Sequence, residues 1–173
     1  MKYFEPIVGV NTARLLYFAG YTYYTRNYYQ EFLKDVSYRD GEINYSKGDI
    51  VFSEGSINMS NEFFSEEELS ERYYLIYEAC SLNQATTFLR EKNVFIEIMI
   101  DKTLEPKCCF GVSLYDEKTS KWKSYESDLY KIADYYECWG NAIYFGLSKL
   151  DIHIPIEYDK PHFPMNVYSV DRI

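Results

Sequence analysis

The apolar and aromatic residues near the start of the chain recur at intervals of three and four positions. This spacing places them on one face of a helix, which we predict over residues 12–36 with Asn11 as its N-cap. The face consists of Leu15, Phe18, Tyr21, Tyr24, Tyr28 and Phe32. Gly20 is a point at which the segment can divide into two helices, because a glycine inside a helix costs about 1 kcal/mol relative to alanine.

A second helix is predicted to begin at Ser65. Glu68 follows it at the spacing of a capping box, in which a serine and a glutamate satisfy each other's backbone amides. The positions after this cap continue at helical spacing as far as Cys80. The apolar face of this helix consists of Leu69, Tyr73, Ile76 and Cys80.

Two more segments toward the C-terminus have helical patterns. A short helix carrying Phe88 and Leu89 is predicted over residues 83–92. Ser127 can cap another helix over residues 127–139, which Gly140 and Asn141 would end. The pattern of residues 142–150 fits either a helix or a strand.

Alternating or continuous β-branched and aromatic runs predict strands. Residues 94–100 form an almost continuous run, which is typical of a central strand, and residues 108–115 are expected to pair with it antiparallel. Short strands at 43–45 and 49–52 are predicted to form a hairpin, and residues 55–61 fit a strand or a loop. Residues 152–157 alternate as in a strand, with Pro155 placing it at an edge or bulge, and residues 167–170 can close on a sheet.

These elements predict the α+β class. No internal repeat, linker or low-complexity stretch interrupts the sequence, and its 173 residues lie in the ordinary single-domain range. We therefore expect one globular domain over residues 1–173, built from a mostly antiparallel sheet with helices packed on one face.

The composition indicates a folded chain with an acidic balance. Aromatic residues make up 19% of the chain. Disordered chains contain few of them and therefore cannot bury enough apolar surface to offset the entropy cost of ordering. With 18 Lys and Arg against 27 Asp and Glu, the net charge is −9. Phosphate backbones and anionic membrane surfaces should be repelled, so we expect neither a nucleic-acid nor a membrane partner.

Two features predict a cytoplasmic protein. The first residues contain no apolar stretch long enough for a signal peptide, and no run approaches the roughly 20 apolar residues that span a bilayer. The cysteines lack CxxC spacing, so we expect reduced and mostly buried thiols. They are Cys80, Cys108, Cys109 and Cys138.

The sequence predicts no catalytic residue, no metal and no cofactor. The two histidines, His153 and His162, have no sequence neighbours that suggest a nucleophile and its base. The cysteines and histidines lack the closely spaced pairs of zinc sites, and the 8 glycines form no phosphate-binding motif. A hydrolytic pair of distant carboxylates stays open, because the sequence does not give their separation.

Most of the negative charge lies between residues 49 and 89, where eight acidic residues accompany only one basic residue. Helix capping explains the glutamates at the predicted helix start, but not Asp49, Glu54 and Glu62 before it. Concentrated negative potential speeds encounter with a basic protein and orients it, and aromatic neighbours can anchor the contact. The predicted partner-binding residues are Asp49, Glu54, Glu62, Glu66, Glu67, Glu71, Tyr74 and Glu78.

In this profile the chain resembles the small acidic immunity proteins of bacterial toxin systems, including contact-dependent inhibition. The resemblance rests on the short length, the acidic region from Glu62 to Glu78, the many tyrosines and the lack of a catalytic motif. It implies a cytoplasmic inhibitor that forms a one-to-one complex with a basic toxin domain, commonly a nuclease, and covers its active cleft. Such proteins share no motif, so the resemblance assigns no role to any residue.

Two other functions stay open at this point. One is a phage or mobile-element inhibitor that mimics nucleic acid, which requires carboxylates spaced like phosphates. The other is a small enzyme or ligand-binding domain with a Tyr- and Cys-lined pocket. That pocket would join Cys108 or Cys138 to His153 or His162.

Overall fold

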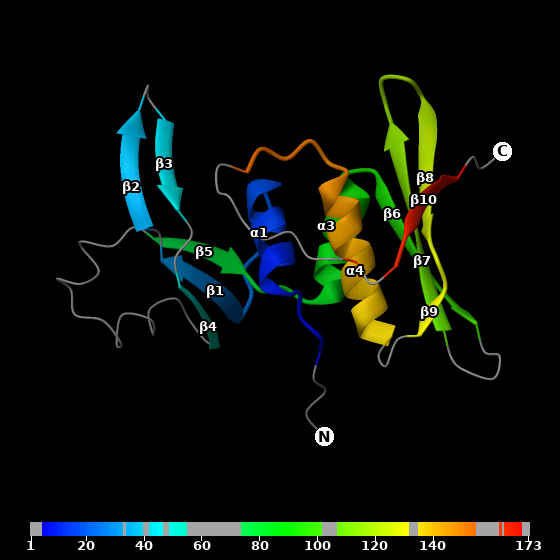
Figure 1. The fold of residues 1–173 in the computed structure, drawn as a ribbon, viewed down its shortest axis with the longest axis horizontal. Coiled ribbons are helices and arrows are strands. Elements are labelled where there is room, and N and C mark those ends of the chain that lie inside the picture. Colours follow the sequence, from blue (N-terminus) through cyan, green and yellow to red (C-terminus); the bar gives the residue numbers. More distant parts are fainter. Residues whose placement is uncertain are drawn as a thin grey trace.

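Helices lie between two antiparallel sheets (Figure 1). The computed structural model describes residues 5–32, 34–39, 42–46, 49–54, 74–101, 107–131, 135–154, 163 and 165–170. The described helices are α1 (Val10–Phe18), α3 (Leu82–Glu91) and α4 (Tyr135–Ser148). Helices α3 and α4 pack on one face of the larger sheet, and α1 contacts α4 and strand β5 of the smaller sheet, so the predicted α+β class is confirmed. The extent of one domain over residues 1–173 stays a prediction.

The larger sheet has the order β10-β8-β7-β6, with β9 beside β7. Its strands are β6 (Val94–Asp101), β7 (Lys107–Asp116), β8 (Lys121–Ser127), β9 (Tyr130–Lys131) and β10 (Val167–Val170). Phe110, Val112 and Leu114 share the face that α4 covers, since Phe110 contacts Phe145 of that helix. Gly146 lets α4 approach closely, because a Cβ there would lie only 3.1 Å from Cγ1 of Val94.

The smaller sheet has the order β4-β1-β5, and a separate two-stranded ribbon pairs β2 with β3. These strands are β1 (Asn27–Phe32), β2 (Lys34–Arg39), β3 (Glu42–Ser46), β4 (Ile50–Glu54) and β5 (Tyr74–Glu78). The side of β1 that bears Tyr29 and Glu31 faces α1, together with Tyr77 of β5. A single hydrophobic cluster then joins α1, β5, α3, β6, β7 and α4.

The capping of α3 explains why this helix begins where it does. The hydroxyl of Ser81 accepts from the backbone N–H of Gln84 at 3.2 Å, and the Gln84 side chain accepts from the N–H of Ser81 at 3.0 Å. Buried Leu82, Ala85, Phe88 and Leu89 then hold the helix on the core.

Replacing Ser81 by alanine should lower the free energy of unfolding by about 1 kcal/mol, because one helix N–H loses its acceptor. Urea denaturation followed by circular dichroism measures this loss. Thr87→Ala, an exposed change in the same helix, is the matched control and should stay within about 0.5 kcal/mol of the parent. Equal stability of the Ser81→Ala protein and the parent would show that the cap contributes nothing.

Several predicted elements are confirmed. The helix expected at 83–92 is α3, the antiparallel pair at 94–100 and 108–115 is β6 with β7, and the strand at 167–170 is β10. The 142–150 segment, whose pattern fits a helix or a strand, belongs mainly to α4. One detail is wrong: β6 lies at the edge of the larger sheet, and β7 and β8 are its central strands.

The long helix predicted over residues 12–36 is wrong beyond Phe18. The chain leaves the helix at Ala19 and Gly20, where Gly20 adopts φ 87°, a left-handed conformation that glycine reaches without a Cβ penalty. Tyr28 and Tyr29 lie in β1, where aromatic side chains are favoured, whereas Tyr21, Tyr23 and Tyr24 precede this strand. The N-cap is Gly9, and Asn11 lies inside the helix.

Strand pairing also departs from prediction. The strands at 43–45 and 49–52 exist as β3 and β4, but β3 pairs with β2 and β4 pairs with β1, so they are not one hairpin. The helix predicted to extend to Cys80 is wrong over Tyr74–Glu78, which is β5. Ala79 and Cys80 are not helical either, and residues 65–73 of that helix, like residues 55–61, lie outside the described residues.

The C-terminal third contains two more corrections. Ser127 ends strand β8 and does not cap a helix, while Gly140 and Asn141 lie within α4 and do not end it. Residues 151–154 are not a strand, and the later positions of the predicted 152–157 strand lie outside the described residues. No helix in the described part of the chain is long and apolar enough to cross a membrane.

Candidate protein-binding surfaces

The edge strand β4 presents apolar side chains to solvent. Ile50, Val51 and Phe52 are 39%, 43% and 42% exposed, although an aliphatic or aromatic run of this kind is usually buried. The strand pairs with β1 on one side, and the Phe52 ring rests against Tyr29, with ring centroids 5.2 Å apart. We call this run, together with the exposed Asp49 and Glu54 that flank it, the β4 surface.

The other predicted partner-binding residues have different positions. Glu78 accepts from the backbone N–H and the hydroxyl of Thr25, at 2.9 and 2.7 Å, and so fixes the segment that leads into β1. Tyr74 begins β5, opposite Phe32. The remaining four, Glu62, Glu66, Glu67 and Glu71, lie outside the described residues. The structure therefore places Asp49 just before β4 and Glu54 at its end, and it engages Glu78 within the fold.

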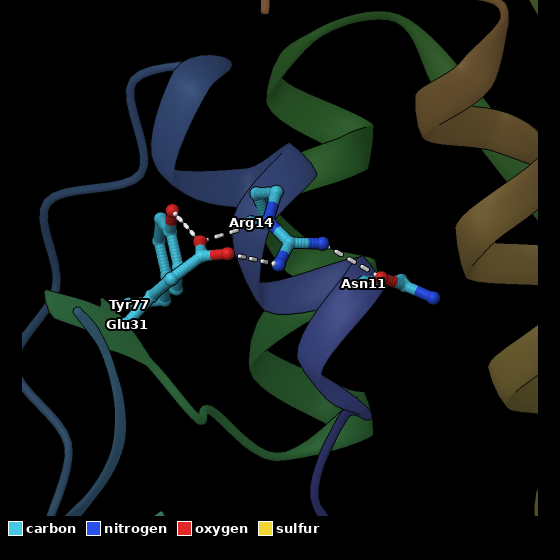
Figure 2. Close-up of polar contacts among 4 residues, drawn as sticks. All are labelled: Asn11, Arg14, Glu31 and Tyr77. Carbon is cyan, nitrogen blue, oxygen red and sulfur yellow. Dashed lines mark hydrogen bonds and ion pairs between the residues drawn. The ribbon is translucent and has the colours of Figure 1, made fainter. Parts of the chain in front are cut away.

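A buried ion pair joins α1 to the smaller sheet (Figure 2). The guanidinium of Arg14 donates to both carboxylate oxygens of Glu31, at 2.9 and 3.3 Å, and also to Oδ1 of Asn11 at 2.8 Å. The hydroxyl of Tyr77 donates to Glu31 Oε2 at 2.5 Å. Both charged side chains are almost wholly buried, so each depends on the other for solvation.

The electrostatics of this network indicate a structural role. Burial raises the pKa of Tyr77, and its hydrogen bond to Glu31 raises it further, so the phenol stays a proton donor. Burial alone would lower the pKa of Arg14, but the hydrogen bond and attraction to Glu31 outweigh it and raise the pKa. A permanently charged guanidinium and a protonated phenol hold the carboxylate and orient α1 on the sheet.

An aromatic cluster that was not predicted from the sequence lies on the outer face of the larger sheet, the face that points away from the helices. Trp122 of β8 contacts Tyr115 of β7 and Phe95 of β6, with centroid distances of 5.1 and 5.5 Å. Trp122 is 54% exposed. The signal was present, since Trp122, Ser124 and Glu126 alternate with Lys121, Lys123 and Tyr125 as in a strand with two different faces.

The thiols and histidines do not meet in a site among the described residues. Cys80, Cys108 and Cys138 are buried, Cys109 is half-buried, and His153 is exposed after α4. Burial raises the pKa of Cys80 to about 11, which leaves its thiol protonated and unreactive near neutral pH. His162 lies outside the described residues.

Thiol chemistry provides a direct check on this arrangement. Ellman's reagent should label Cys109 in the native protein first, because the other three thiols are buried. Cys109→Ser should remove this early phase, and denaturant should release the remaining thiols. Early labelling of Cys80, located by mass spectrometry of the digested protein, would contradict the burial of that thiol.

Two hollows have walls that consist of described residues. One, of about 420 Å³, lies between Tyr21, Tyr23 and the start of α3, and the other, of about 340 Å³, lies between the start of α1 and α4. Neither wall contains a cysteine or a histidine, so neither is the pocket that the enzyme alternative requires. No group of three or more metal-ligating side chains is found in the part of the chain that the structure describes.

Comparison with known proteins adds no relative. No family model matches the sequence, and no match was found among the curated proteins or among the solved structures.

Proposed function

We propose that this protein is an inhibitor of the immunity-protein type, which neutralises a basic toxin domain in the bacterial cytoplasm by binding over its active cleft. A nuclease is the toxin class that best fits, because its cleft must attract phosphate and is therefore basic. The binding site begins at the β4 surface, and we expect it to include Glu62, Glu66, Glu67 and Glu71, which follow β4 in the sequence.

One observation carries this proposal: three exposed apolar residues stand between two exposed carboxylates on a sheet edge. Apolar side chains that become desolvated supply binding energy, whereas surrounding charges supply orientation and a fast encounter. Among the described strands β4 lies at a sheet edge, and an edge strand also offers backbone N–H and C=O groups to a strand of the partner. The β4 surface combines these three contributions within six consecutive residues, 49–54.

The same strand favours a protein partner over nucleic-acid mimicry. Asp49 and Glu54 are five residues apart, or about 17 Å along an extended strand. Phosphates along one DNA strand recur every 3.4 Å or so of helix axis, which a mimic has to approximate. Apolar side chains occupy the interval between the two carboxylates here, and such side chains suit a protein surface.

Site-specific photo-crosslinking tests the proposal. A photoreactive phenylalanine analogue replaces Val51, with Thr87 on α3 as the matched exposed control, and both proteins are irradiated in the native host. We expect position 51, and not position 87, to capture a basic protein. Purified, that protein should lose its toxic activity when it is mixed with one equivalent of the inhibitor.

Two outcomes of the crosslinking experiment would contradict different parts of the proposal. Capture of a basic protein whose activity is unaffected would refute inhibition but keep binding. Equal products from positions 51 and 87, or an acidic partner at position 51, would refute the β4 surface as the docking site.

A further inference from the structure

The hollow of about 340 Å³ between α1 and α4 lies where both helices begin. The first turn of α1 lines one side of it, and one face of α4 lines the other. Both helices start at the same end of the molecule (Figure 1). The positive ends of their dipoles therefore lie beside this hollow, where they favour a negative group. The lining residues are Gly9, Val10, Asn11, Thr12, Glu137, Gly140, Asn141 and Tyr144.

The α1 side of the hollow offers hydrogen-bond donors. The N-cap is Gly9, which has no side chain to cap the helix, and the first N–H that turns back onto the helix is that of Ala13, which donates to the carbonyl of Gly9 at 2.9 Å. The N–H groups of Val10 and Thr12 donate to no described residue. Unpaired N–H groups at a helix start bind carboxylates and other anions.

Thr12 is an independent sign that this hollow takes a ligand. It is only 7% exposed and lines the hollow, yet its hydroxyl has no hydrogen-bond partner within the described part of the chain. Buried hydroxyls are normally paired, because the loss of water without a replacement costs free energy. The buried Thr86, by contrast, donates to the carbonyl of Leu82 at 2.8 Å. A molecule in the hollow would supply the partner that the Thr12 hydroxyl lacks.

Gly140 keeps the α4 side of the hollow open. Glycine inside a helix is unfavourable relative to alanine, so its presence there calls for a packing or functional reason. Gly146 of the same helix has a packing reason, because a Cβ there would lie 3.1 Å from Val94. A Cβ at Gly140 would meet no described atom within 4 Å. Close packing against the described residues therefore does not explain Gly140, whereas space for a ligand does.

A carboxylate on the α4 side limits the charge that a ligand can carry. Glu137 lines the hollow from the first turn of α4, and its exposed side chain forms no ion pair with any described residue. It would repel a purely anionic ligand, and so would the net charge of −9. A ligand with both a carboxylate and an ammonium group is attracted at both sides of the hollow.

We infer that this hollow binds a free α-amino acid. The carboxylate accepts from the N–H groups of Val10 and Thr12 and from the Thr12 hydroxyl, while the ammonium donates to Glu137. The side chain of the amino acid lies beside Gly140. An α-amino acid carries its two charges close together and is small enough for a hollow of this size. The site is independent of the β4 surface, which belongs to the smaller sheet.

Nuclear magnetic resonance of the labelled protein tests this inference. The protein is titrated with each common L-amino acid at millimolar concentration. The amino acid that binds best is then compared with its amide, which lacks the carboxylate, and with its α-hydroxy acid, which lacks the ammonium. We expect the amino acid to shift the amides of Val10, Thr12 and Gly140. Both analogues should bind about tenfold more weakly or worse, the loss expected when one charged contact is removed.

Variants assign the contacts. Glu137→Gln should weaken binding of the amino acid about tenfold but should not weaken binding of the hydroxy acid, because only the ammonium contacts this carboxylate. Gly140→Leu fills the hollow and should abolish binding. The matched control, Asp151→Asn after α4, should change the affinity less than about twofold. If Gly140→Leu does not fold, the amide and hydroxy-acid comparison on the unmodified protein decides.

Three results would overturn the inference. One is the absence of any response at Val10, Thr12 and Gly140 to all of the amino acids. Another is equal affinity for the amino acid and its hydroxy acid, because Glu137 would then make no contact with the ammonium. The third is a set of shifts confined to the other hollow, beside Tyr21 and the start of α3.

Discussion

Replacing Glu31 by alanine is expected to lower the free energy of unfolding by about 3–5 kcal/mol, the cost of leaving one member of a buried ion pair without its partner. Glu31 is fully buried and receives hydrogen bonds from Arg14 and Tyr77. Without Glu31, the Arg14 guanidinium stays in the protein interior but loses the two carboxylate oxygens to which it donates. A domain of this size has about 5–15 kcal/mol of stability, so the variant should be close to unfolding.

Urea denaturation of matched variants measures this loss. Glu54→Ala removes an exposed carboxylate from the neighbouring strand and should change stability by less than about 0.5 kcal/mol. Arg14→Met combined with Glu31→Leu replaces both charges by apolar groups and should recover most of the lost stability. A loss below about 1 kcal/mol for Glu31→Ala would show that the pair does not hold α1 on the sheet.

Reversing the charges of the β4 surface is expected to slow association with the captured partner by about ten- to a hundredfold at low salt. Asp49→Lys and Glu54→Lys turn the two carboxylates that frame the strand into cations, which repel a basic surface. Stopped-flow mixing at low and high ionic strength gives the rate constants. The difference between variant and parent should shrink as salt screens the charges.

Neutral and remote variants serve as controls for this experiment. Asp49→Asn with Glu54→Gln should fall between the parent and the reversed variant, because attraction is lost without added repulsion. The same reversal at Glu66, Glu67 and Glu71 tests whether the remaining predicted residues belong to the binding surface. Unchanged association rates in the folded Asp49→Lys, Glu54→Lys protein would refute a steering role for β4.

The sequence was sufficient to predict an element where the residue pattern and the segment that packs against it lie close together along the chain. Residues 94–100 and 108–115 lie close together along the chain, and their alternation predicts the observed face on which Phe110, Val112 and Leu114 lie. Helix α3 has an apolar face and a cap within one short segment. In each case the residues that specify the element also contact each other or one neighbouring element.

Prediction failed where a distant strand decided the structure. The tyrosines after Gly20 fit helical spacing, yet Tyr28, Gln30 and Phe32 also alternate, and pairing with β4 and β5 selects the strand. Likewise Tyr74–Glu78 continues a helical pattern, but β1 supplies hydrogen-bond partners for an extended chain. The secondary-structure propensity of a short segment does not contain information about these long-range strand pairings.

The binding surfaces were accessible to sequence reasoning only in part. The acidic charge of Asp49 and Glu54 was evident, but the exposure of the apolar residues between them depends on the position of β4 at a sheet edge. Glu78 had the same acidic signal, and only the structure shows its bonds to Thr25. Arg14 and Glu31 are separated by 17 positions, and no motif connects them.

Hydrogen exchange of the protein alone and in complex with the protein captured at Val51 tests the central claim most directly. If a cationic partner docks on the β4 surface, the amides of residues 50–54 should exchange more slowly in the complex. This protection should weaken at high salt, because screening of the charges weakens the complex. Unchanged exchange across 50–54, with protection elsewhere on the molecule, would contradict the claim.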